Sequence, residues 1–202
     1  MLSKLWRVAQ AVVIITKEMA LSGVKVLELE GIGPGPLGAC ILADFGADVV
    51  SISRLVKGKV RSQADPVSRG KRSIALDLKS PEGLAALKRL ASKADVFIEP
   101  FRPGVVEKMG CGPEVLCALN PRLIYGRMTG FGQGGTKFEK MAGHDANYLA
   151  LSGTLDLFRR EGDRPAPPAN FAGDYAGGGV MLAMGVLLAL IDRGKSGKPV
   201  GF

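Results

Sequence analysis

Aromatic residues are scarce in this chain: they make up 6% of its 202 residues, and only one of them is tryptophan. Proteins that bind single-stranded nucleic acid need aromatic side chains on which the bases stack, so the composition argues against that class. The net charge of +8 does not change this, because the basic residues occur as short pairs with acidic residues between them. We therefore expect no nucleic-acid partner, and a phosphorylated small molecule explains the positive charge equally well.

Cysteine is also rare. Cys40, Cys111 and Cys117 are odd in number, lack the spacing of metal ligands and lie in apolar surroundings. A disulfide framework and a cysteine-based metal site are therefore not expected. We predict reduced cysteines packed in the core of a protein from a reducing compartment.

Long apolar runs are missing too. The run from Met181 to Ile191 is too short to span a bilayer, and its small residues suit a helix packed against a sheet. We expect no membrane partner. With 47% hydrophobic residues, the chain can nevertheless bury a core of ordinary size.

The first residues differ from the rest of the chain. Residues 1–18 contain Lys4, Arg7 and Lys17, and no acidic residue before Glu18. Such a segment is either a transit segment or a disordered extension, so we predict that it lies outside the fold. The remainder, residues 19–202, is predicted to form one α/β domain.

Strand and helix patterns alternate along that domain. Alternating or apolar β-type segments predict strands over 24–29, 48–53, 72–78, 95–99 and 123–129. A loop is expected over 31–38, and helices over 37–45, 81–92, 113–119 and 175–193, with Ser80 as the N-cap of the second. This order predicts a Rossmann-like parallel sheet flanked by helices, whose ligand binds at the carboxyl ends of the strands.

Residues 33–38 read Gly-Pro-Gly-Pro-Leu-Gly and satisfy the glycine pattern of dinucleotide-binding loops. Pro34 and Pro36 weaken that interpretation because they remove two backbone donors from the loop. Arg54, directly after the second predicted strand, suits either the 2′-phosphate of NADP or the 3′-phosphate of coenzyme A. Both cofactors remain open from these residues alone.

The candidate chemistry lies at His144 and Asp174, each of which stands beside glycine. An imidazole and a carboxylate held close to a substrate can remove and return a proton on opposite faces of one carbon. The simpler interpretation is a packed or capping histidine and an aspartate that caps a helix. The spacing alone leaves both interpretations open.

Several blocks of sequence resemble the family III CoA-transferase group, and within it the α-methylacyl-CoA racemase branch. They occur in family order over about residues 19–198. The blocks are residues 26–36, 42–50, 69–73, 76–79, 99–105, 122–125, 129–133, 143–148 and 173–174.

The resemblance implies that His144 and Asp174 are the two bases that racemise a 2-methylacyl-CoA thioester at its α-carbon. This chemistry requires a desolvated Asp174, to which we expect Phe171 and Tyr175 to contribute, and donors for the enolate, which we expect from backbone amides at the start of the Asp174 helix. Coenzyme A is then part of the substrate, and no tightly bound cofactor is expected. The residues implied to contact it are Arg54, Leu76, Asp77, Leu78, Lys79, Arg102, Gly143, His144, Asp145, Ala146, Asn147 and Tyr148.

Two alternatives remain. One is a CoA transferase in which Asp174 is the nucleophile, and the other is an inactive CoA-binding fragment. The second arises because relatives continue beyond Phe202 into a small domain, so 19–202 corresponds to the N-terminal part of the large domain. The resemblance also implies a homodimer for the full-length family, branched-chain fatty acid or bile acid metabolism, and a mitochondrial or peroxisomal location.

Overall fold

The computed structural model describes residues 18–54 and 65–197. Their centre is a five-stranded parallel sheet in the order β3-β2-β1-β4-β5, which confirms the predicted fold class. The predicted extension 1–18, apart from Glu18, and the chain after Gly197 lie outside these residues. The strands are β1 (Lys25–Leu29), β2 (Asp48–Arg54), β3 (Lys71–Leu76), β4 (Val96–Glu99) and β5 (Ile124–Arg127).

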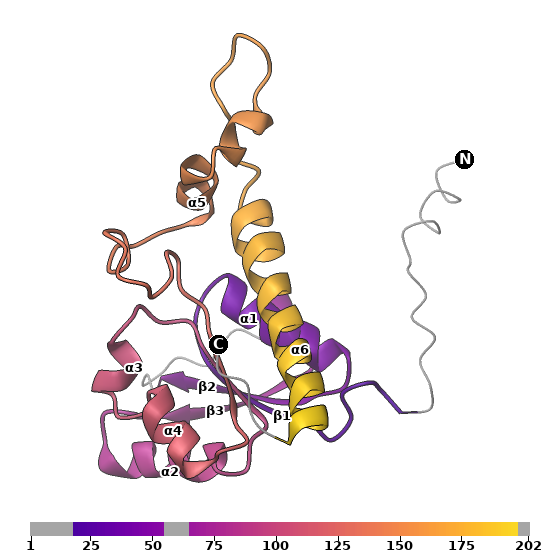
Figure 1. Ribbon diagram of the computed structural model, residues 1–202, viewed down its shortest axis with the longest axis vertical. Coiled ribbons are helices and arrows are strands. Elements are labelled where there is room, and N and C mark those ends of the chain that lie inside the picture. The colour runs from indigo at the N-terminus through magenta and orange to yellow at the C-terminus, as the bar shows by residue number, and fades with distance from the viewer. Residues whose placement is uncertain (1–17, 55–64, 198–202) are drawn as a thin grey trace.

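Helices cover both faces of the sheet (Figure 1). On one face, α1 (Pro34–Asp44) and α6 (Met181–Ser196) pack over a cluster that includes Val26, Val49 and Ile98. The opposite face carries α2 (Pro81–Ala91), α3 (Val105–Lys108) and α4 (Pro113–Leu119) over a second cluster. The two clusters use alternate residues of each strand, as expected for a sheet buried on both sides.

Several predicted boundaries were wrong, and the fifth strand ends at Arg127 rather than at residue 129. The third strand ends at Leu76 rather than at residue 78, because Asp77 begins a turn in which its side chain accepts the Lys79 N–H at 3.0 Å. The first helix begins at Pro34 within the expected loop, since a proline in the first turn has a suitable φ and needs no backbone donor there. The predicted cap of α2 is confirmed: Ser80 Oγ accepts the Gly83 N–H at 3.0 Å.

The last predicted helix is longer than expected. A π-helix, η4 (Phe171–Val180), continues directly into α6, so one rod of 26 residues extends well beyond the sheet in Figure 1. This rod is the one helix of the described chain that is long and apolar enough, by length and composition alone, to cross a membrane. Core helices of soluble proteins can pass the same test, and Leu182, Ala183 and Val186 are buried against α1 and the sheet.

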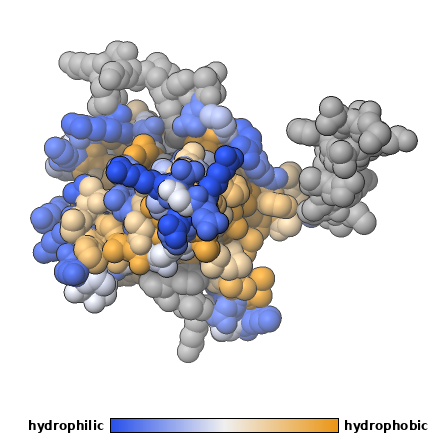
Figure 2. Space-filling view, turned by 90° about the horizontal axis from the view of Figure 1, so that it is seen from above, coloured by the Kyte–Doolittle hydropathy of each residue, from blue (hydrophilic) through white to orange (hydrophobic). Residues whose placement is uncertain are grey.

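The segment between the sheet and the rod holds two short helices, α5 (Asp145–Leu151) and η3 (Thr154–Phe158). Figure 2 looks onto this end of the molecule, where hydrophilic side chains form the protruding tip and apolar side chains surround it. Residues 156–167 in the tip are all exposed.

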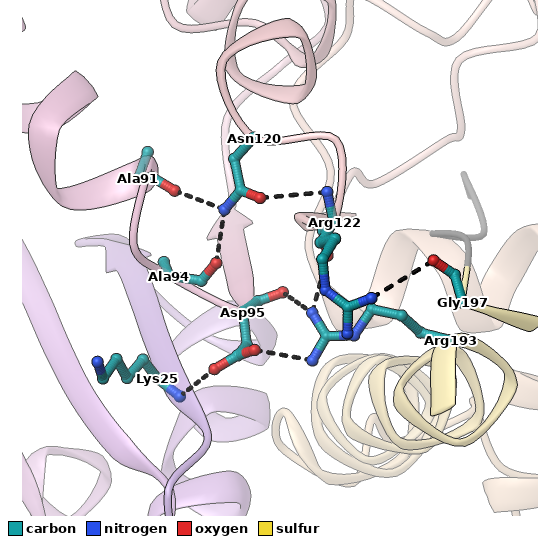
Figure 3. Close-up of polar contacts among 8 residues, drawn as sticks. All are labelled: Lys25, Ala91, Ala94, Asp95, Asn120, Arg122, Arg193 and Gly197. Atoms are coloured by element: carbon teal, nitrogen blue, oxygen red, sulfur yellow. Dashed lines mark hydrogen bonds and ion pairs between the residues drawn. The ribbon is translucent and has the colours of Figure 1, made fainter. Parts of the chain in front are cut away.

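At the other end of the sheet, a polar network ties the last turns of α6 to the strands (Figure 3). Arg193 donates to the Asp95 carboxylate at 2.8 Å and to the Arg122 carbonyl at 2.8 Å. The second Asp95 oxygen accepts the backbone N–H of Lys25 at 2.9 Å. Arg193 is only 8% exposed, so a charged side chain is buried here with its partners in place.

The predicted packing in the core is confirmed for Cys40 and Cys111, which are buried, while Cys117 is half-buried. Burial raises the pKa of the Cys111 thiol from 9.0 to about 11. The folded state therefore keeps this proton at a pH where the unfolded chain has lost it. The stability that this thiol contributes is present below pH 9.0 and is lost as the pH rises toward 11.

We therefore expect the free energy of unfolding to fall more steeply with pH in the wild-type chain than in Cys111→Ala. The expected excess is about 1 kcal/mol between about pH 9 and pH 10. Urea unfolding in reducing buffer at several pH values measures both slopes. Equal slopes in the two proteins would contradict the buried-thiol argument.

Candidate active site

One large cleft, of about 1070 Å³, opens where β1, β4 and β5 end. The loops after these strands contribute Gly33, Arg102 and Gly130, while the start of α5 and the π-helix close the remaining sides. The strand order reverses between β1 and β4, and ligands of open α/β sheets bind at this kind of switch point. The cleft thus lies where the sequence predicts that the ligand binds, at the carboxyl ends of the strands.

The two candidate bases line this cleft from different elements. His144 precedes the first residue of α5 and is exposed, and its backbone N–H donates to Asn147 Oδ1 at 2.9 Å. Asp174 lies in the fourth position of the π-helix and is half-buried, so it is not the helix cap. The structure therefore brings together two groups that are thirty residues apart in the sequence.

Asp174 has an unusual environment for a carboxylate. Burial, together with the nearby Asp145 carboxylate, raises the pKa of Asp174, and His144 opposes part of this rise. The expected contribution of Phe171 is wrong, because that side chain is 66% exposed. The Asp174 carboxylate also lies close to the backbone of Gly33, since a Cβ on Gly33 would lie 3.5 Å from Asp174 Oδ2.

Asp145 makes a contact that the sequence did not reveal. This residue is 3% exposed, and its Oδ2 accepts the backbone N–H groups of Gly173 at 2.6 Å and of Asp174 at 2.7 Å. The amides at the start of the Asp174 helix were expected to hold an enolate, but these two are already occupied. No local pattern signals a bond across 28 residues.

Aromatic rings form the wall beside His144. Tyr148 and Phe131 meet edge-to-face with centroids 5.3 Å apart. A Cβ on Gly143 would lie 2.6 Å from the Tyr148 ring and 2.7 Å from the Phe131 ring. Gly143 is thus required by the close approach of the two rings, of which Tyr148 lines the cleft and Phe131 packs against it.

The predicted coenzyme A contacts fall into two groups. Of these, Arg102, Gly143, His144, Asp145, Ala146 and Tyr148 line the cleft. The others do not line it in the described chain: Asn147 bonds the His144 N–H, while Arg54 and Leu76 pair at the carboxyl ends of β2 and β3. Asp77 forms the turn that follows, Leu78 packs against the second core cluster, and the Lys79 N–H closes the turn.

Comparison with known proteins identifies relatives of this chain. A family model described as CoA-transferase family III matches residues 21–200. The chain is 53% identical to human alpha-methylacyl-CoA racemase over 180 residues, which are 89% of this chain and 46% of that protein. It is 36% identical over 191 residues to human succinyl-CoA:glutarate CoA-transferase, covering 88% of this chain and 43% of that protein.

A solved structure agrees with the fold. The crystal structure of a CAIB/BAIF family protein from Brucella suis superposes with a TM-score of 0.83 at 32% identity. That match covers 92% of this chain and 53% of the other. The chain thus spans about half the length of the relatives it matches.

Proposed function

This chain belongs to CoA-transferase family III, and from that premise we propose that it racemises 2-methylacyl-CoA thioesters at the α-carbon. The observation that carries the proposal is the placement of His144 and Asp174 in one cleft, on separate elements. Two bases that approach from different sides are what inversion at one carbon requires. The similarity to alpha-methylacyl-CoA racemase supports the same chemistry.

The proposed reaction proceeds by proton transfer alone. One base removes the α-proton, and the C–H electron pair passes into the thioester carbonyl to give an enolate. The other base then delivers its proton to the opposite face of the carbon. In one direction neutral His144 accepts and protonated Asp174 donates, and in the other direction ionised Asp174 accepts and the His144 imidazolium donates. The raised pKa of Asp174 favours this exchange of roles, because it keeps the protonated carboxyl accessible.

We propose that the rest of the substrate extends from this cleft along the carboxyl ends of the strands. We place the thioester and pantetheine beside residues 143–148, and the nucleotide phosphates near Arg102, Arg54 and the turn at 77–79. The Arg54 side chain is exposed at the end of β2, and a guanidinium in that position suits a phosphate. Coenzyme A enters as part of the substrate in this proposal, so the site holds no separate cofactor.

The second candidate is a CoA transferase, supported by the similarity to succinyl-CoA:glutarate CoA-transferase. In that reaction the Asp174 carboxylate attacks the thioester carbonyl, expels the CoA thiolate and becomes an acyl anhydride. His144 has no necessary role in that step. The two candidates therefore differ in whether His144 is required.

The deciding experiment follows a chiral 2-methylacyl-CoA with the purified chain in deuterated water. We expect inversion with uptake of one solvent deuteron at the α-carbon, and loss of inversion in His144→Ala. CoA transfer to an added carboxylate that survives in His144→Ala, with no inversion in either protein, would support the transferase instead. Binding of the thioester without either reaction would support the third alternative, an inactive fragment that binds coenzyme A.

A further inference from the structure

The buried carboxylate of Asp145 joins the two elements that carry the candidate bases. Asp145 is the residue directly after His144, and its Oδ2 accepts the N–H of Asp174 itself as well as that of Gly173. The first N–H groups of a helix need acceptors, and Asn170, which precedes the π-helix, provides no side-chain bond to them. Asp145 therefore caps the π-helix from another part of the chain.

We propose that Asp145 is a positioning residue, which fixes Asp174 relative to His144 and holds a second negative charge beside Asp174. This inference rests on the proposed function, for which the separation of two bases is decisive. The positioning role follows from the two short hydrogen bonds of Asp145, which connect the start of α5 to the π-helix. The role of the charge follows from the burial of Asp145. Its carboxylate is 3% exposed, so water screens its charge only weakly.

The fit around Asp145 is close. A Cβ on Gly173 would lie 3.1 Å from Asp145 Oδ2 and 3.2 Å from its Cγ. The two hydrogen bonds to Asp145 therefore depend on glycine at position 173. The other oxygen, Oδ1, is buried and has no hydrogen-bond partner among residues 18–54 and 65–197. Asp145 lines the cleft, and this oxygen can still accept a hydrogen bond there.

The charges around Asp174 come from few elements. The start of α5 presents Asp145, His144 and Tyr148, whereas the start of α1 meets the π-helix through Gly33 and Pro34, which carry no charge. The charged residues of α6 lie in its last turns, and Arg102 and Glu139 line the same cleft. Asp145 is the neighbouring charge that raises the pKa of Asp174, and only burial raises it more.

Two substitutions separate the charge from the position. Asp145→Asn keeps the size of the side chain and removes its charge. We expect proton exchange to slow by about 10-fold with little change in KM, because a neutral amide oxygen holds the two N–H groups less strongly than a carboxylate does. In the direction where ionised Asp174 removes the proton, the rate falls at acidic pH as Asp174 becomes protonated. This acidic limb of the pH–rate profile should move to lower pH, because the charge that raises the pKa of Asp174 is gone. Gly173→Ala keeps the charge and disturbs the contact, so the rate should fall while that limb stays in place.

The matched control is Asp192→Asn, the same change at an exposed carboxylate on α6, which should leave the rate and the profile unchanged. The second readout is the NMR titration of the Asp174 carboxyl carbon, assigned with Asp174→Asn, which needs no turnover. We expect Asp174 to titrate at lower pH in Asp145→Asn than in the wild-type chain.

If Asp174 titrates at the same pH in Asp145→Asn as in the wild-type chain, the proposed role of the charge is wrong. Rates in both variants equal to that of Asp192→Asn would overturn the positioning role. If Asp145→Asn fails to fold, Gly173→Ala still tests positioning. If the wild-type chain shows no exchange, the proposed function fails, and the titration still decides whether the charge of Asp145 acts on Asp174.

Discussion

Replacing either candidate base is expected to abolish inversion at the α-carbon while leaving half of the reaction intact. We expect His144→Gln and Asp174→Asn each to lower the rate of inversion by about 10³-fold, because general acid–base groups contribute factors of about 10² to 10⁴. Each variant keeps one base, however. His144→Gln should still exchange the α-proton of the enantiomer that faces Asp174, and Asp174→Asn should exchange that of the other enantiomer.

Single enantiomers in deuterated water measure this directly, with mass spectrometry for deuterium and chiral separation for inversion. The control is Asn147→Ala, which disturbs the bond to the His144 N–H but removes neither base, so both enantiomers should still exchange. Exchange of the same enantiomer in both base variants would be incompatible with bases on opposite faces. Full inversion in either variant would exclude that residue as a base.

The second large effect concerns stability. We expect Arg193→Met to lower the free energy of unfolding by about 3 kcal/mol, the lower end of the range for breaking a buried ion pair. The reason lies in the network of Figure 3: loss of the guanidinium leaves one oxygen of the Asp95 carboxylate and the Arg122 carbonyl without this donor. The Asp95 side chain is 30% exposed and is partly stabilised by water, which keeps the effect below the maximum.

Arg159→Met is the matched control. Arg159 also pairs with an aspartate at 2.8 Å, but both side chains are well exposed. Exposed pairs contribute about 0 to 1 kcal/mol, so this variant should unfold nearly as the wild-type chain does in urea. A loss in Arg193→Met no greater than in Arg159→Met would show that the network does not stabilise the junction of α6 with the sheet.

Local patterns predicted most of the fold. Alternating and apolar runs placed all five strands to within a few residues, and Ser80 followed by Pro81 marked the start of α2. The errors occur where tertiary contacts decide. The helical rod begins at Phe171 because the N–H groups of Gly173 and Asp174 find their acceptor on Asp145, and no nearby residue signals that bond.

The sequence by itself determined the parallel α/β architecture, the family, and the identity of the two candidate bases, because these depend on residue types and their order along the chain. Only the tertiary structure decided that His144 and Asp174 share a cleft with Arg102, and that Arg54 and the 77–79 turn lie apart from its lining. It also decided the protonation tendency of Asp174. A pKa is set by burial and by the charges that surround a group, and these come from segments that meet only when the sheet has formed.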